Sequence, residues 1–279
     1  MEYSANEIRE LRLMAAKLRG DILEMIPPGK AGHLGGSSSI ADVTAALYFK
    51  HMKVFKDPKD PRRDRCVFSK GHAVLAQYAA LCELGYFDRS ELPLVKTLNG
   101  TLQGHPDVDH TPGIEAVTGS LGQGLSVSLG MAFGLKVDGS YSSVYCIVGD
   151  GELDEGQIWE AAMAAAAYKQ DNLCAIVDRN NVQATDTIDK VLPNGQLKEK
   201  FEAFGWNVVE IDGHDMQQIL CALDNARATK GRPTAIIANT IKGKGFPFAE
   251  GKAAYHNAAM NEEEYKLAQE LVAKMKEEA

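Results

Sequence analysis

Two polar loops, each directly after an apolar run, carry oxygen ligands that suit a hard metal ion. The run at residues 144–148 ends in Gly-Asp-Gly, which places Asp150 between two glycines, and the run at 173–177 is soon followed by Asn180. Magnesium prefers such carboxylate, amide and carbonyl oxygens and commonly shares them with phosphate oxygens, and the glycines permit close approach of a ligand to the backbone. Either motif alone is more often an ordinary turn. Asp150 and Asn180 lie 30 residues apart, which suits one strand–helix–strand unit, and together they predict a metal–diphosphate site.

Four short apolar runs predict the strands that position these loops. They lie at residues 144–148, 173–177, 207–211 and 234–238. Continuously apolar strands are buried on both faces, so we expect an α/β fold with a mainly parallel sheet covered by helices on both faces. In such a sheet, ligands bind beyond the carboxyl ends of the strands, where both polar loops would lie.

Apolar residues at helical spacing predict the helices around this sheet. A helix is expected over residues 8–25, with Ser4 and Glu7 as its capping box and Pro27 as its stop. The final helix should open at Asn261 with Glu264. Further helices are expected at 37–51, 73–84 and 159–168, and a surface loop at 57–65. We expect one domain over residues 1–258, with residues 259–279 as its C-terminal helix.

The overall composition excludes several classes of protein. The 279 residues are 45% hydrophobic and 24% charged, as in ordinary globular proteins, and the net charge of −8 argues against a nucleic-acid partner. No apolar run approaches the length of a membrane span. The 5 cysteines form no CxxC pair, which argues against a disulfide framework or a zinc site. The charged N-terminus has no signal core, so we expect a cytoplasmic protein.

Six glycine- and histidine-rich motifs follow one another along the chain. They are GHLG at 32–35, SKGH at 69–72, GHP at 104–106, TGSLGQG at 118–124, GDGE at 149–152 and KGKG at 242–245. The GDG followed by an asparagine resembles the signature of thiamine diphosphate enzymes. The complete ordered set resembles the N-terminal, diphosphate-binding domain of transketolase, over most of the chain.

This resemblance implies roles for particular residues. Asp150, Asn180 and the carbonyl of Val182 would hold Mg²⁺ (with Ca²⁺ or Mn²⁺ as possible substitutes), and the metal would bridge the phosphates of thiamine diphosphate. Gly151 and Asn180 would approach the diphosphate directly. The loop of Gly119, Ser120 and Leu121 would face the aminopyrimidine ring. Glu155 matches an acidic residue that the family places in a network between its two active sites.

Four of the seven histidines fall in the family's motifs. Imidazoles titrate near neutrality, so they can pass protons and bind hydroxyl groups. The resemblance implies that all four are catalytic groups around the reactive thiazolium carbon and the substrate oxygens: His33, His72, His105 and His256. Two of them, His72 and His256, would also contact the cofactor. We expect His51 and His110 to be structural. His214 follows a predicted strand and could lie near the site.

The implied reaction is transfer of a two-carbon ketol (glycolaldehyde) unit from a ketose phosphate to an aldose phosphate, as in the pentose phosphate pathway. In this family a second domain binds the aminopyrimidine and supplies a catalytic glutamate. After the strand at 234–238 only a loop and a helix remain, too little for that domain. We therefore expect the N-terminal subunit of a split transketolase, joined to a C-terminal subunit with the pyrimidine domain in an α2β2 assembly.

Four alternatives stay open. The nearest is a related thiamine diphosphate ketol transferase or acyloin synthase that acts on a sulfonated, deoxy or branched sugar. The others are a subunit of a 2-oxo acid decarboxylating enzyme, a nucleotide-binding α/β module and a non-catalytic regulatory relative. The sequence departs from the family in GHLG, where many full-length members have GHPG, and in Asn257, which follows His256 where glycine is frequent.

Overall fold

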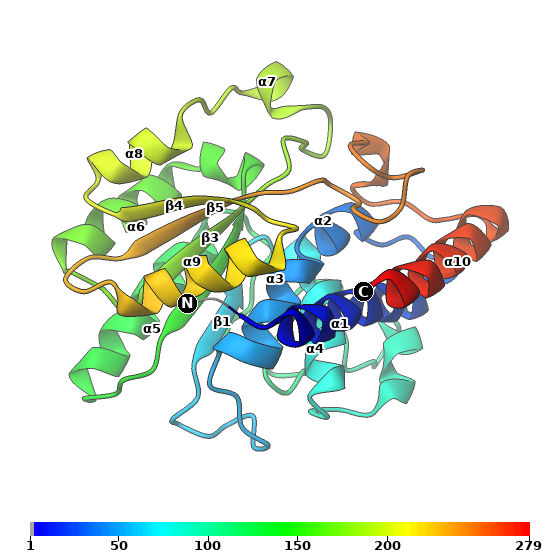
Figure 1. Ribbon diagram of the computed structural model, residues 1–279, viewed down its shortest axis with the longest axis horizontal. Helices are drawn as coiled ribbons and strands as arrows, with labels where there is room; N and C mark the ends of the chain where they lie inside the picture. Colours follow the sequence, from blue (N-terminus) through cyan, green and yellow to red (C-terminus); the bar gives the residue numbers. More distant parts are fainter. Residues whose placement is uncertain (1–2) are drawn as a thin grey trace.

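A sheet of five parallel strands forms the centre of the computed structural model, which describes residues 3–279 (Figure 1). The strand order is β1-β2-β3-β5-β4. The strands are β1 (Arg65–Phe68), β2 (Val144–Gly149), β3 (Leu173–Arg179), β4 (Asn207–Asp212) and β5 (Thr234–Asn239). The four predicted strands and the parallel α/β fold are confirmed, each strand one or two residues longer than predicted. The edge strand β1 was not predicted, and it begins at Arg65, inside the expected surface loop.

Alternate residues of the central strands are buried against helices on opposite faces. In β2, Tyr145 and Ile147 belong to one buried cluster, whereas Val144, Cys146 and Val148 belong to the other. Strand β3 divides in the same way. This two-sided burial explains why these strands are apolar at every position rather than at every second one.

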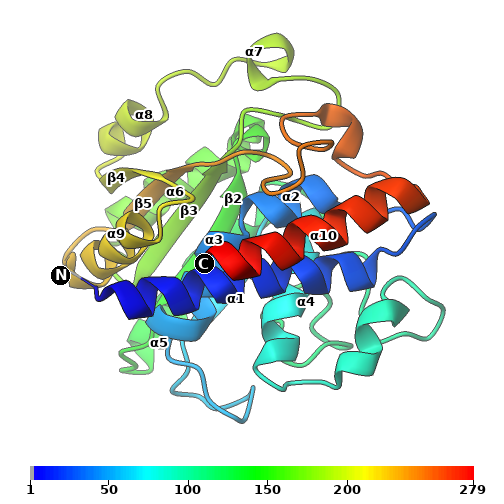
Figure 2. The ribbon, with the colours of Figure 1, turned by 45° about the vertical axis from the view of Figure 1, so that its right-hand side comes forward.

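Five helices form most of the larger of these two layers. They are α1 (Ala5–Met25), α3 (Ala41–Ala46), α4 (Val74–Glu83), α9 (Met216–Ala228) and α10 (Glu262–Glu278). Helices α1 and α10, from opposite ends of the chain, lie side by side (Figure 2). Both predicted capping boxes are present: the Ser4 side chain bonds Glu7 N, and the Asn261 side chain bonds Glu264 N.

The other face carries α5 (Gln123–Val137), α6 (Gly156–Ala167) and α8 (Leu197–Ala203). The predicted alanine-rich helix is α6, which starts three residues earlier and ends one residue earlier than predicted. The short α7 (Ile188–Val191) stands away from the sheet (Figure 1). Sequence analysis did not identify α5, because its apolar residues surround the helix without a clear stripe.

The predicted helix at 37–51 is wrong in both its start and its continuity. The structure has α2 (Leu34–Ser39), a break at Ile40, α3, and then a π-helical turn (Leu47–His51). Serine side chains in a helix compete for backbone hydrogen bonds, and Ser39 Oγ contacts both Gly36 O (3.1 Å) and Asp178 Oδ2 (2.6 Å). The break thus brings a hydroxyl from α2 to the carboxyl end of β3.

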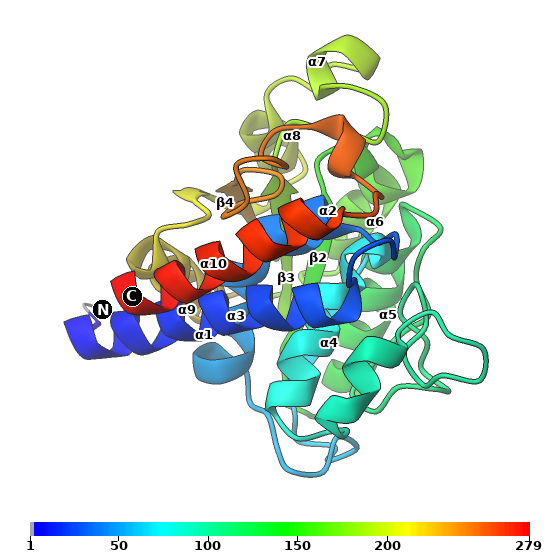
Figure 3. The ribbon, with the colours of Figure 1, turned by 90° about the vertical axis from the view of Figure 1, so that its right-hand side faces the viewer.

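The segment that follows β5 returns over α2 at the carboxyl edge of the sheet (Figure 3). Gly243 N donates to Gly35 O at 2.9 Å, and Gly32 pairs with Ala258 in an isolated antiparallel bridge. The chain's first and last motifs are therefore brought together above β2 and β3. Within residues 3–279, no helix has the length and apolar character needed to cross a membrane.

Candidate active site

A cavity of about 140 Å³ opens at the carboxyl ends of β2 and β3. Of the residues predicted for the site, seven line it: His72, Leu121, Asp150, Gly151, Asn180, Val182 and His256. Lys70, Glu152, Gln183 and Lys242 also contribute to the wall. The two polar loops identified in the sequence therefore share one hollow.

Asp150 is a buried carboxylate on this wall, only 3% exposed. Its Oδ1 accepts from Gly151 N at 2.9 Å and its Oδ2 accepts from Asn181 N. Burial, together with the negative charge of Asp178, raises the pKa of Asp150 to about 6. A bound cation would relieve the cost of ionising this carboxylate.

The two other predicted metal ligands lie beside Asp150. Asn180 Oδ1 accepts from Val182 N at 3.2 Å, and the Val182 carbonyl accepts from Lys242 Nζ at 2.8 Å. Within residues 3–279 no group of three His, Cys, Asp or Glu side chains is arranged to hold a metal, so a metal here would depend on one carboxylate, one amide and one carbonyl. These hard oxygens fit Mg²⁺ with its remaining positions given to phosphate and water, and the carbonyl already faces a cation.

A buried ion pair beneath the cavity orients this wall. Lys70 Nζ bonds Asp178 Oδ2, and both side chains are at most 1% exposed. Burial alone would raise the pKa of Asp178, but the charge of Lys70 and hydrogen bonds from Lys70, Ser39 and Thr240 hold it below its usual value. Asp178 Oδ2 also accepts from Asn180 Nδ2 at 3.1 Å. Lys70 lies in the SKGH motif and Asp178 directly follows the run at 173–177, but neither residue had a predicted role.

Lys242 is a second buried cation that sequence analysis left without a role. Its Nζ lies 3.0 Å from His256 Nδ1, in addition to its bond to Val182. Burial and the charge of Lys70 lower the pKa of Lys242 to about 8. The KGKG motif therefore supplies a side chain to the centre of the cavity wall.

Four histidines from separate segments gather at this place. The ring of His33, at the start of α2, lies 5.4 Å from that of His72, 6.0 Å from that of His105 and 5.4 Å from that of His256, measured between centroids. The rings of His72 and His256 are 4.8 Å apart. The structure thus brings together all four histidines predicted as catalytic.

Burial keeps these imidazoles uncharged. It lowers the pKa of His33 to about 3, with a contribution from the charge of Lys96, and that of His72 to about 2, with a contribution from Lys70. Burial and the charge of Lys242 lower the pKa of His256 to about 4. The pKa of His105 is also lowered, by burial and by Lys96. At neutral pH each ring can both donate and accept a hydrogen bond.

The loop of Gly119, Ser120 and Leu121 lies against His105 and reaches the cavity. Gly119 has φ +140°, and a Cβ there would lie 3.1 Å from the His105 ring. Leu121 lines the cavity, whereas Ser120 is exposed. The buried Glu152 holds this loop in place, since its Oε1 accepts from Gly122 N at 2.9 Å and its Oε2 from Gly149 N at 3.0 Å. Glu152 is another contributor that the sequence did not single out.

Four other residues considered in the sequence lie outside the cavity wall. Glu155 is exposed at the start of α6. His51 packs against the Tyr145 ring, and the exposed His110 pairs with Asp107 at 2.9 Å. His214 lies 2.8 Å from Asp42 and accepts from Ile241 N at 2.9 Å, one residue before Lys242.

Comparisons with known proteins match this chain to transketolases or their subunits. Residues 11–277 match the family model described as transketolase, thiamine diphosphate binding domain. The chain is 46% identical over 274 residues to the 6-deoxy-6-sulfo-D-fructose transketolase subunit of Clostridium sp. (strain MSTE9), covering 96% of this chain and 94% of that protein. It is 41% identical over 263 residues to an apulose-4-phosphate transketolase subunit of Phocaeicola vulgatus, covering 94% and 93%.

A solved structure shows the same arrangement of elements. Transketolase from Campylobacter jejuni superposes with a TM-score of 0.85 at 33% identity, over 97% of this chain. This chain spans 43% of that protein. The matched part of the longer protein therefore corresponds to the whole of the fold described above.

Proposed function

The chain belongs to the transketolase family, and on that premise we propose that it is the N-terminal, diphosphate-binding subunit of a split transketolase. With a partner that carries the pyrimidine domain and the catalytic glutamate, it would transfer a two-carbon ketol unit from a ketose to an aldose. One observation carries the proposal: four uncharged imidazoles stand over a single wall formed by Asp150, Asn180 and Val182.

In this proposal the wall holds the diphosphate through Mg²⁺. Asp150, Asn180 Oδ1 and the Val182 carbonyl would be the protein ligands, with Ca²⁺ or Mn²⁺ as substitutes, and Gly151 would approach the phosphates with its backbone. When bound, thiamine diphosphate supplies the electron sink for breaking and forming the carbon–carbon bond. The nearby ammonium group of Lys242 adds positive charge on the same side.

The histidines would bind the substrate and transfer protons to and from it. Sugars present several hydroxyl groups, and neutral imidazoles can donate to one oxygen while they accept from another. His33 and His105, on the outer side of the cluster, would bind substrate oxygens. His72 and His256 line the cavity itself and would contact both cofactor and substrate. Proton transfer among these rings would accompany bond cleavage.

An exposed apolar face favours a partner subunit. Phe133 and Val137 of α5 and Met163 of α6 are 47%, 73% and 58% exposed. A Cβ at Gly130 or Gly134 of α5 would meet no atom within 4 Å, so a neighbouring backbone could approach closely there. Large apolar faces of this kind mark protein interfaces. We propose that partner subunits cover it in an α2β2 assembly, and the exposed Glu155 at the start of α6 would lie at the same interface.

Two lysines at the mouth of the histidine cluster favour an anionic sugar. Lys30 Nζ bonds only Pro93 O, and Lys96 Nζ bonds only Ala31 O, among the contacts of residues 3–279. Burial lowers the pKa values of Lys30, His33 and His105, and the charge of Lys96 lowers each of them further. Neither lysine forms an ion pair with a carboxylate of residues 3–279, so both ammonium groups would be available to a phosphate or sulfonate. Sugar phosphates are one candidate class of substrate. Modified sugars are the second candidate class, because two relatives are named for 6-deoxy-6-sulfo-D-fructose and apulose 4-phosphate.

The location that we propose is the cytoplasm. The five cysteines, all within the described residues, form no disulfide. Four of them are buried in the core, which agrees with a reducing compartment.

Reconstitution with the partner tests the function. The chain is co-expressed with a candidate pyrimidine-domain subunit, and ketol transfer is measured against a panel of phosphorylated, sulfonated and neutral ketoses with thiamine diphosphate and Mg²⁺. We expect transfer only from the assembled pair and only with anionic ketoses. Full transfer by this chain alone would overturn the split-enzyme proposal, and decarboxylation of a 2-oxo acid without ketol transfer would replace it.

A further inference from the structure

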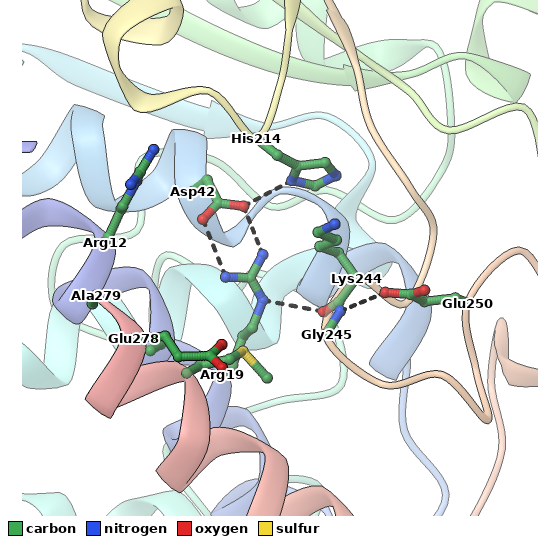
Figure 4. A pocket seen from close by; sticks show the side chains of 11 residues that line it. Arg12, Arg19, Asp42, His214, Lys244, Gly245, Glu250, Glu278 and Ala279 are labelled. Atoms are coloured by element: carbon green, nitrogen blue, oxygen red, sulfur yellow. Dashed lines mark hydrogen bonds and ion pairs between the residues drawn. The ribbon is translucent and has the colours of Figure 1, made fainter. Parts of the chain in front are cut away.

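A polar network behind the active site connects α1 and α3 to the segment that carries Lys242. It borders a second hollow, of about 360 Å³, between α1, α10 and the segment after β5. Figure 4 shows the centre of the network, where the guanidinium of Arg19 and the ring of His214 both point at the carboxylate of Asp42. None of these three residues lines the cavity that holds Asp150 and Asn180.

Arg19 and Asp42 form the buried base of this network. The guanidinium nitrogens lie 3.1 and 2.7 Å from the two carboxylate oxygens, in a two-pronged ion pair. Arg19 also donates to Ser38 O at 3.1 Å and, through Nε, to Lys244 O at 3.1 Å. Such a planar pair has a fixed geometry, so Asp42 is a rigid acceptor.

His214 connects this base to the backbone of Ile241. Its Nδ1 lies 2.8 Å from Asp42 Oδ2, and its Nε2 lies 2.9 Å from Ile241 N. A backbone amide can only donate, so Nε2 accepts, and the proton of the neutral ring is therefore on Nδ1, where it is donated to Asp42. Each ring nitrogen thus makes one distinct contact, and a substitution by an amide side chain can remove either contact alone.

The segment anchored in this way supplies the cavity wall. Lys242, the residue after Ile241, bonds the Val182 carbonyl and lies against His256. The next residue, Gly243, bonds Gly35 of α2. Arg19 and His214 therefore hold residues 241–244 from one side, while Lys242 reaches the opposite side.

We propose that His214 is a positioning residue for the cofactor site, which acts through residues 241–242 to fix Lys242 against Val182 and His256. It touches neither substrate nor cofactor in this arrangement. The functional part of the inference rests on the proposed function, because Val182 and His256 matter for cofactor binding only if the cavity holds thiamine diphosphate.

A matched pair of substitutions separates the two ring nitrogens. In His214→Asn the side-chain amide nitrogen takes the place of Nδ1 and still donates to Asp42, but nothing accepts from Ile241 N. In His214→Gln the amide oxygen reaches the place of Nε2 and can accept from Ile241. Both variants are neutral and polar, and each keeps one of the two contacts, so a role limited to the contact with Asp42 would loosen the segment no more in His214→Asn than in His214→Gln.

The first measurement is hydrogen–deuterium exchange of the full chain without cofactor. We expect residues 241–245 to exchange about fivefold to tenfold faster in His214→Asn than in His214→Gln, as the loss of one hydrogen bond implies. Equal exchange in the two variants would overturn the inference. This result does not depend on the function of the cavity.

The second measurement is the affinity of the assembled enzyme for thiamine diphosphate with Mg²⁺. His214→Asn should bind about fivefold to tenfold more weakly than His214→Gln, and this difference should vanish when both carry Lys242→Met, because the effect passes through Lys242. A difference that persists with Lys242→Met would overturn the inference. If the unmodified assembly binds no thiamine diphosphate, the proposed function fails, and the exchange experiment still decides whether His214 fixes the segment.

Discussion

The amide nitrogen of Asn180 donates to Asp178 Oδ2 across 3.1 Å, and this contact decides which way the Asn180 amide faces. Because Asp178 takes the nitrogen, the oxygen is left for the side of Val182, where it accepts a backbone N–H. Asp178 in turn is held by Lys70, Ser39 and Thr240. The orientation of a proposed metal ligand thus depends on a carboxylate that would never touch the metal.

Breaking the buried pair should destabilise the fold strongly. Asp178→Asn leaves Lys70 buried without its counter-charge, so we expect the free energy of unfolding in urea to fall by about 3–5 kcal/mol. Asp186→Asn is the matched control, because Asp186 pairs with Lys190 at the surface, and it should leave the unfolding curve unchanged. A curve for Asp178→Asn that overlays the control would contradict this account of the site.

Removing the Asp150 carboxylate should abolish metal-dependent cofactor binding. In the assembled enzyme, Asp150→Ala should weaken binding of thiamine diphosphate with Mg²⁺ by about 100-fold or more, as expected for a lost buried charge contact. Titration calorimetry with and without a chelator measures this, and chelation should mimic the substitution. Asp189→Asn, on the exposed α7, is the control. Unchanged affinity in Asp150→Ala would remove Asp150 from the metal site.

Removal of His105 should impair turnover rather than cofactor binding. His105 lies on the outer side of the cluster, 6.0 Å from His33, and does not line the cavity. His105→Ala should therefore lower kcat/KM by about 100-fold or more, the size of a general acid–base contribution, with unchanged affinity for thiamine diphosphate. His110→Ala, at an exposed surface pair, should behave as the unmodified enzyme. A defect in cofactor affinity alone would place His105 elsewhere.

Acid should destabilise the cofactor-free chain through the histidine cluster. The folded-state pKa values of His33 and His72 are about 3 and 2, well below the ordinary 6.5. Protons therefore bind the unfolded rings first, and stability that is fully present above about pH 6.5 is lost as the pH falls towards the folded values. Asp150 acts in the opposite direction: its folded pKa, about 6 rather than 3.8, makes ionisation costly as the pH rises between these values.

Urea unfolding between about pH 7 and pH 4.5 tests both signs of this linkage. His33→Gln should reduce the loss of stability on acidification, and Asp150→Asn should increase it. An equal loss of stability on acidification in His33→Gln and in the unmodified chain would show that His33 is not held neutral.

A charge on the apolar face should prevent assembly. Phe133→Asp places a carboxylate on α5, and burying it in an interface would cost far more than leaving it in water. We expect light scattering after gel filtration to show separate subunits, with an unchanged circular dichroism spectrum. Tyr141→Asp is the control, since Tyr141 is 94% exposed beyond the end of α5. An intact assembly with Phe133→Asp would move the partner to another surface.

Four of the five strands and the two polar loops at the carboxyl ends of β2 and β3 could be predicted from the sequence, because each depends on a local pattern. Buried parallel strands are apolar at every residue, and four were found in this way. The gathering of the four histidines came instead from resemblance, since they lie in separate segments between residues 33 and 256 that no spacing rule connects.

The parts that the sequence did not predict depend on long-range contacts between charges. Lys70 and Lys242 look like ordinary surface lysines until the fold buries both. Asp178 appeared to be one polar residue of a loop, although it ends up with no exposed surface. The break at Ile40 could not be predicted from local sequence either, because it accompanies a contact between Ser39 and Asp178, which are 139 residues apart.

The bridge between Gly32 and Ala258 has a consequence for synthesis on the ribosome. Domains begin to fold from the N-terminal side while the chain emerges, yet Lys242 and His256 emerge only after all five strands of the sheet. The nascent protein can pair β1, β2 and β3 long before it can close the cavity. The cavity wall can therefore be completed only after all five strands have emerged, and a ligand that needs Lys242 and His256 binds after that point.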